Sequence, residues 1–202
     1  MKNVIVVLPG ENETSIRERI TAALQTDFSP PEIWWFDADR LIAAKLPIKT
    51  VRCLPAPEVR SADCYLPLLN KLFNEFKPQL MLFGAEIMEK DLCAALASDC
   101  FADDGCAGEI KTNEANANET NTNEANAGIG GCALGVTSIT RERRGLCITR
   151  VVQDTQLEDS FLFTGYPCFF SVVKERFKPT VWQGKPELLT TKYSFPEQNR
   201  GF

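Results

Sequence analysis

Two short runs of the sequence are almost entirely apolar, and each leads directly into a glycine-containing turn. The first run covers residues 3–8 (NVIVVL) and precedes a Pro-Gly pair, and the second covers residues 79–83 (QLMLF) and precedes a Gly-Ala pair. Uninterrupted apolar runs of this length are typical of strands buried on both faces, as in a parallel sheet. This feature constrains the fold most, because such strands require helices on both faces of the sheet.

The chain between and after these runs alternates between strand and helix patterns. Helices are predicted over residues 11–26, 37–46, 61–77 and 87–98, and further strands over residues 32–36 and 49–54. Alternation from residue 3 to residue 98 predicts an α/β fold with three layers: a mainly parallel sheet, with right-handed crossovers and helices on both faces.

The second half of the chain has a different pattern. Residues 113–127 form three pentads, NEANA, NETNT and NEANA, which contain no large apolar side chain and predict a disordered insert. From residue 131 the pattern is β-rich, with a hairpin around residues 141–145, and we expect an antiparallel second half. The stretch 180–202 is polar and broken by prolines, so the sequence predicts an irregular C-terminal tail.

Composition excludes several classes of function. The chain has no histidine, which removes histidine-dependent triads and metal sites, and no cysteine pair has CxxC spacing, so we expect no metal. A net charge of −5 without a basic block argues against nucleic acid. The apolar run near the N-terminus is too short for a signal peptide or membrane insertion, so we expect a cytoplasmic protein whose thiols stay reduced.

The loops after the two apolar strands are the candidate ligand sites, because open α/β sheets bind ligands at the carboxyl edge of their strands. The candidate nucleotide-binding residues in these loops are Pro9, Gly10, Gly84 and Ala85. Both loops bring a glycine next to a helix N-terminus, where free amides can receive a phosphate. Neither loop has a P-loop or GxGxxG pattern, and Glu11 and Glu86 would repel a phosphate, so ordinary tight turns are the alternative interpretation.

Catalytic residues are not predicted anywhere in the chain. An enzyme that used a thiol such as Cys93 or Cys100 would lack a histidine to activate it.

One segment is similar to a known family. Residues 84–97 (GAEIMEKDLCAALA) resemble the G-A-[ST]-x-x-G-[RK]-D-[LV]-A-x-x-[LV]-A segment of the N-terminal domain of electron transfer flavoprotein alpha subunits. The matching residues include Lys90, Asp91 and Leu92, whereas Glu86 and Glu89 replace a small residue and a glycine. Further on, residues 145–150 end in the Thr-Arg pair of the family with Arg150, and residues 167–173 resemble its next strand. The resemblance extends over most of residues 1–179.

The resemblance implies a scaffold domain without its own flavin domain, acting as an electron-transfer component rather than a catalyst. In the family, FAD is held mainly by a second, C-terminal domain, so FAD is expected only in complex with a partner or a separate flavin domain, and none on the isolated chain. The implied partner is a beta-like subunit in a heterodimer. The wider fold group, which is adenine nucleotide alpha hydrolase-like, includes AMP and ATP binders, so a free-standing adenine-nucleotide-binding module is the alternative.

Overall fold

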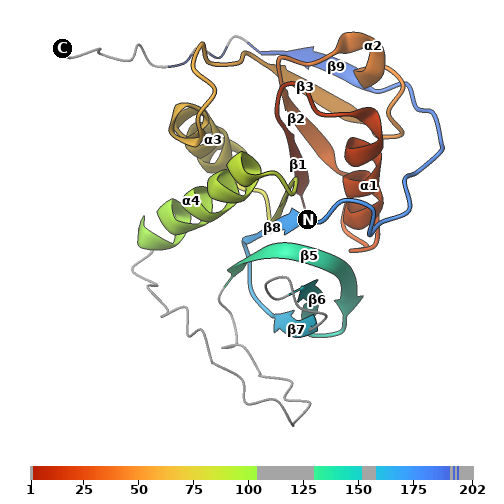
Figure 1. The fold of residues 1–202 in the computed structure, drawn as a ribbon, viewed down its shortest axis with the longest axis vertical. Coiled ribbons are helices and arrows are strands. Elements are labelled where there is room, and N and C mark those ends of the chain that lie inside the picture. Colours follow the sequence, from red (N-terminus) through yellow and green to blue (C-terminus); the bar gives the residue numbers. More distant parts are fainter. Residues whose placement is uncertain (1, 104–129, 152–157, 192, 194, 196–202) are drawn as a thin grey trace.

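The computed structural model describes residues 2–103, 130–151, 158–191, 193 and 195 (Figure 1). The pentads at residues 113–127, which the sequence predicts to be disordered, lie outside the described residues. Residues 192, 194 and 196–202 of the predicted tail lie outside them as well.

Helices and strands follow one another closely along the described chain. The helices are α1 (Glu13–Leu24), α2 (Arg40–Ala43), α3 (Ala62–Phe76) and α4 (Ile87–Asp103). The strands are β1 (Asn3–Val7), β2 (Glu32–Phe36), β3 (Thr50–Leu54), β4 (Leu80–Phe83), β5 (Gly131–Glu142), β6 (Gly145–Val151), β7 (Glu158–Phe163), β8 (Cys168–Val172) and β9 (Glu187–Thr190). Among the described residues they form one nine-stranded mixed sheet in the order β7-β6-β5-β8-β4-β1-β2-β3-β9.

Helices cover both faces of this sheet, so the prediction of an α/β fold with a mainly parallel sheet is confirmed. Figure 1 shows α1 on one side of the strands and α3 and α4 on the other. Alternate residues of β1 point to opposite faces: Ile5 packs with Ile16 and Ile20 of α1, and Val6 belongs to the cluster around α3 and α4. The side chains on both faces of this central strand are therefore buried, as the uninterrupted apolar run predicts.

The predicted antiparallel second half is only partly correct. β5, β6 and β7 form an antiparallel meander, but β8 runs parallel to both β4 and β5. Every residue of β8 is buried, since this strand lies inside the sheet next to β4. A strand that is buried on both faces is more typical of parallel pairing inside a sheet than of a hairpin at the edge of a sheet.

The predicted irregular tail also needs correction. Residues 187–190 form β9, which pairs in parallel with β3 and extends the sheet at that edge. Main-chain hydrogen bonds hold this strand. Its two end residues are exposed and its two middle residues are half-buried, so four residues leave little hydrophobic signal in the sequence.

β5 is the longest of the described strands, and it curves away from the parallel part of the sheet (Figure 1). Its pairing with β8 ends at Val136 and Val172, and its second half pairs with β6 alone among the described strands. β5 therefore connects the parallel layer to the β6–β7 hairpin, and α4 covers its beginning.

Candidate functional site

The loops after β1 and β4 lie next to each other, because these two strands are neighbours in the sheet. A cavity of about 260 Å³ opens between them. Its lining residues are Leu8, Pro9, Gly10, Glu11, Asn12, Ser15, Glu86, Met88, Glu89 and Lys174. Of the four candidate residues, Pro9 and Gly10 line the cavity, whereas Gly84 and Ala85 lie just before its lining residue Glu86. The structure thus brings the two predicted loops together.

Protein side chains already cap the first of these loops. Glu11 Oε1 accepts a hydrogen bond from the Leu8 amide at 2.7 Å, and Asn12 Oδ1 accepts one from the Ser15 amide at 2.8 Å. Asn12 is the N-cap residue of α1. Gly10, with a φ of +87°, lets the chain turn between the strand and this cap. An amide that would bind an anion here is therefore already hydrogen-bonded to the protein.

The Glu89 side chain likewise caps the start of α4. Its Oε2 accepts a hydrogen bond from the Glu86 amide at 3.1 Å, and its Oε1 lies 3.3 Å from Arg19 Nη1. The carboxylate fits because residue 84 is glycine: a Cβ there would lie 2.2 Å from both carboxylate oxygens. The space that a phosphate would need at this helix N-terminus thus contains the carboxylate of Glu89.

Arg19 is the cation that holds this arrangement together. Its side chain is only 1% exposed, donates to the Val6 carbonyl at 2.7 Å, and forms ion pairs with both Glu89 and Glu11. Burial lowers the pKa of Arg19 to about 10, an effect that Glu89 opposes, so the guanidinium stays charged at neutral pH.

Sequence reasoning missed Arg19, although a signal was present. Arg19 lies three residues after Ile16 and beside Ile20, on the face of α1 that packs against the sheet. A charged residue on an apolar helix face has to find a buried partner.

Lys174 joins the site from a distant part of the chain. It follows β8, and its Nζ donates a hydrogen bond to Glu86 Oε1, with both side chains well exposed. This hydrogen bond lowers the pKa of Glu86 and raises the pKa of Lys174. Three carboxylates and two cations therefore converge at this edge, and each is engaged with another protein group.

The residues that match the family segment do not gather at this cavity. Lys90 and Asp91 belong to α4, where Lys90 is half-buried and Asp91 is exposed, and Leu92 is part of the core between α4 and the sheet. Arg150 lies on β6, where its guanidinium stacks on the Phe161 ring at 4.8 Å. None of the four lines the cavity between the two loops.

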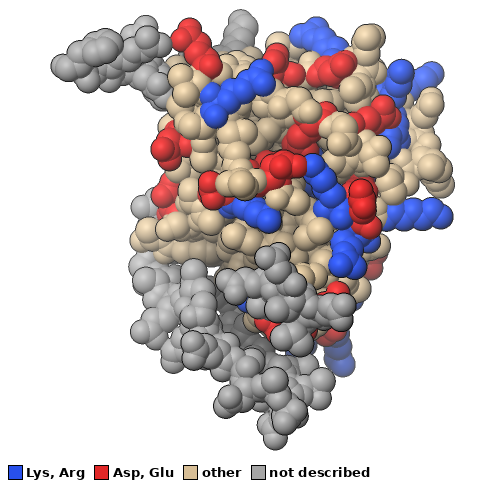
Figure 2. Space-filling model, viewed as in Figure 1, with Lys and Arg blue, Asp and Glu red and all other residues tan. Residues whose placement is uncertain are grey.

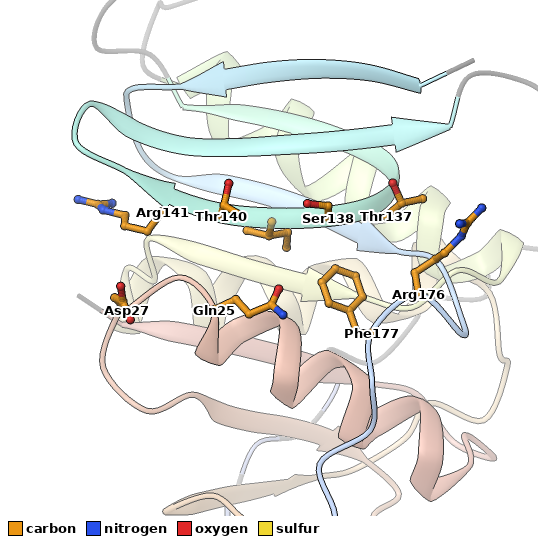
Figure 3. Close-up of a pocket in the computed structure, with 9 residues that line it drawn as sticks. Gln25, Asp27, Thr137, Ser138, Thr140, Arg141, Arg176 and Phe177 are labelled. Carbon is orange, nitrogen blue, oxygen red and sulfur yellow. The ribbon is translucent and has the colours of Figure 1, made fainter. Parts of the chain in front are cut away.

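A second cavity, of about 470 Å³, lies between the end of α1 and the second half of β5 (Figure 3). Gln25 and Phe177 point toward the strand from below, and Arg141 and Arg176 lie at opposite ends. The Arg141 guanidinium is engaged with Tyr166 and stacks on Phe28 at 5.0 Å. Since the two guanidinium groups do not converge, this cavity lacks the arrangement that would bind a single anion.

The segment between β8 and β9, residues 173–186, is held along α1 while it exposes apolar side chains. Arg17 Nη1 donates to the Thr180 carbonyl at 3.1 Å and to the Trp182 carbonyl at 2.6 Å. Even so, the Val181 and Trp182 side chains are 82% and 77% exposed. An exposed tryptophan on a fixed backbone is a feature that protein interfaces use to anchor a partner.

Basic residues accompany this exposed pair. The segment carries Lys174, Arg176, Lys178 and Lys185 against a single acidic residue, although the whole chain has a charge of −5. In Figure 2 lysine and arginine side chains gather along the right-hand edge, where Figure 1 shows this segment.

Among the residues that the structure describes, no group of three or more Cys, Asp or Glu residues could hold a metal ion. No helix among them is long and apolar enough to cross a membrane. A scan against protein-family models and a search of curated proteins both find no match for the chain.

Proposed function

We propose that this domain is an electron transfer flavoprotein alpha-like scaffold that works by binding a beta-like subunit rather than by binding a ligand itself. The observation that carries this proposal is the segment 173–186, which Arg17 fixes in place while Val181 and Trp182 remain exposed. Tryptophan is the residue type most often responsible for binding energy at protein interfaces. A preformed backbone also reduces the entropy lost on association.

The charges of the same segment favour an acidic partner surface. The segment that carries the exposed pair also contains four basic residues, so a partner surface with an apolar pocket and nearby carboxylates would be complementary to it. In this proposal FAD is held by the partner or by a separate flavin domain, and the scaffold supplies no catalytic residue to the flavin chemistry.

The alternative is an adenine-nucleotide-binding module with an adenine nucleotide alpha hydrolase-like fold. In its favour, the 260 Å³ cavity lies at the carboxyl edge of two central parallel strands, where such folds bind ligands. Against it, Glu11, Glu86 and Glu89 line that cavity. The amide that would bind a phosphate already donates a hydrogen bond to Glu89. A bound AMP or ATP would have to displace a carboxylate that is paired with buried Arg19.

Co-purification tests the two possibilities together. The chain is expressed alone and with an adjacent beta-like reading frame, and the mass of the complex, its flavin absorbance and any released nucleotide are measured. A stable heterodimer is expected, with no flavin on the isolated chain. A chain that stays monomeric beside the beta-like subunit contradicts the scaffold proposal, and stoichiometric AMP or ATP on the isolated chain supports the alternative.

Point variants then locate the interface. Trp182→Ala should weaken the heterodimer by about 30-fold, which corresponds to about 2 kcal/mol for a residue that dominates an interface. Val59→Ala is the matched control, since Val59 is also an exposed apolar residue, at 54%, but lies before α3. Equal affinities for the two variants would place the interface elsewhere.

A further inference from the structure

Two cysteines that are far apart in the sequence meet where α4 crosses the beginning of β5. Cys93 lies on α4 and Cys132 is the second residue of β5, and their Sγ atoms are 3.9 Å apart. Both are free thiols. A disulfide needs the two sulfur atoms to approach to about 2.05 Å, so side-chain rotation and a small shift of the two elements separate this contact from a covalent bond.

The two thiols have different access to solvent. Cys93 is completely buried within the core cluster that includes Leu92 and Leu96, whereas Cys132 is only partly buried at the margin of that cluster. A hydrogen bond from Cys93 lowers the pKa of the Cys132 thiol, although burial opposes this effect. Burial raises the pKa of Cys93 well above its ordinary value. Cys132 is therefore the thiol that ionises first and meets a dissolved oxidant.

We propose that Cys93 and Cys132 form a redox-active dithiol site whose substrate is a hydroperoxide, with Cys132 as the attacking thiol and Cys93 as the resolving thiol. The Cys132 thiolate attacks the distal oxygen of the hydroperoxide, the O–O bond breaks, and the leaving alkoxide takes a proton to become an alcohol. Cys132 is now a sulfenic acid.

The second step forms the disulfide. The Cys93 sulfur attacks the Cys132 sulfur, the S–O bond breaks, and the departing hydroxide leaves as water with the proton from Cys93. In total, two thiols and one hydroperoxide give one disulfide, one alcohol and one water, and two electrons pass from sulfur to oxygen. An external dithiol reductant would reverse the oxidation by thiol–disulfide exchange.

The position of the pair explains why resolution should be efficient. Cys93 is already in van der Waals contact with the sulfur that would be oxidised, so the second step needs no unfolding of α4. The disulfide would join two elements that are 39 residues apart and would pin α4 to β5.

The experiment uses the reduced full-length chain and hydrogen peroxide as the probe. After peroxide treatment the remaining thiols are alkylated, the protein is digested without reductant, and the linked peptides are identified by mass. A Cys93–Cys132 peptide is expected, with the loss of two thiols per chain. Linkage of a different pair, or overoxidation of Cys132 without a disulfide, overturns the proposal.

Variants assign the two roles. Cys132→Ser should slow the loss of thiols by at least about tenfold, because it removes the attacking thiolate. Cys93→Ser should stop at a sulfenic acid on Cys132 that dimedone traps. Cys147→Ser, a half-buried cysteine on β6, is the matched control and should behave like the wild type. If the buried Cys93→Ser variant does not fold, peptide mapping of the wild type still decides the outcome.

Discussion

Replacement of Arg19 by methionine should destabilise the protein severely, because the guanidinium neutralises two carboxylates inside the structure. Its side chain is 1% exposed, and its partners Glu89 and Glu11 are 4% and 12% exposed. Arg19→Met keeps most of the apolar volume of the side chain but leaves both carboxylates without their cation and removes a donor from the Val6 carbonyl. Removal of one member of a buried ion pair costs about 3–5 kcal/mol.

The expected loss is a substantial fraction of the stability of an ordinary domain, which is about 5–15 kcal/mol. For a chain of this size it corresponds to a fall in Tm of about 6–20 °C. Urea unfolding, followed by the fluorescence of Trp34 and Trp35, measures the free energy directly. Both tryptophans are buried in the native sheet, and urea leaves the ion pairs unscreened.

Two further variants separate charge from packing. The double variant Arg19→Met with Glu89→Gln should recover at least about 1 kcal/mol relative to additive effects, since the buried negative charge is then removed as well. Arg60→Met is the surface control: Arg60 lies 3.8 Å from Asp37, and the two side chains are 57% and 66% exposed, so the change should stay within about 0.5 kcal/mol. A loss below about 1 kcal/mol for Arg19→Met, or strict additivity in the double variant, would refute the reasoning.

Three other perturbations test separate features of the structure. Gly84→Ala should lower the free energy of unfolding by about 1–3 kcal/mol, because the new methyl group collides with Glu89; an unchanged urea midpoint would contradict this. Lys77→Gly should raise it by about 0.5–1 kcal/mol, since Lys77 ends α3 with a φ of +46°; a loss in the same assay would show that the lysine side chain contributes there. Alkylation at pH 9 should modify Cys132 before Cys168, because burial raises the pKa of Cys168 to about 12, and peptide mapping in which Cys168 reacts first would contradict the assignment.

The first half of the fold could be predicted because each element has a strong local signal. Continuous apolar runs specify β1 and β4, and the predicted strand at residues 32–36 matches β2 residue for residue. The end of α3 follows from Pro78, which comes directly after the residue that terminates the helix. Such elements are determined by short stretches of sequence, so they can be identified without knowledge of their partners.

The strands of the second half could not be placed in the same way, because pairing depends on distant partners. The run that forms β8 reads as a strand, but only its position between β4 and β5 makes it parallel. β9 is held by its main-chain pairing with β3, and its sequence, ELLT, shows no alternation over enough residues to be recognised.

The candidate site could be predicted from the sequence only in part. The structure places the two predicted loops side by side, and Glu11 and Glu86 line the cavity between them, whereas ligand binding at these loops and repulsion of a phosphate by the two glutamates stay predictions. The decisive contacts were not predicted, since Arg19 of α1 lies 70 residues before Glu89 of α4 in the sequence, although their side chains are 3.3 Å apart in space. A pair of this kind is visible only after α1 and α4 are placed on the same sheet.

Glu89 depends on Gly84 and on Arg19. This dependence explains how a glutamate fits at position 89, where the family segment has a glycine. A glutamate at position 89 needs a residue without a Cβ at position 84, because its carboxylate occupies that space. It also needs a buried cation, because a carboxylate at 4% exposure is unfavourable without one. With all three present, the amide at the start of α4 is satisfied from within the protein, and an anionic ligand would gain that hydrogen bond only by breaking an existing one. The carboxyl edge thus contributes to stability, which is consistent with a function that lies on the exposed segment after β8.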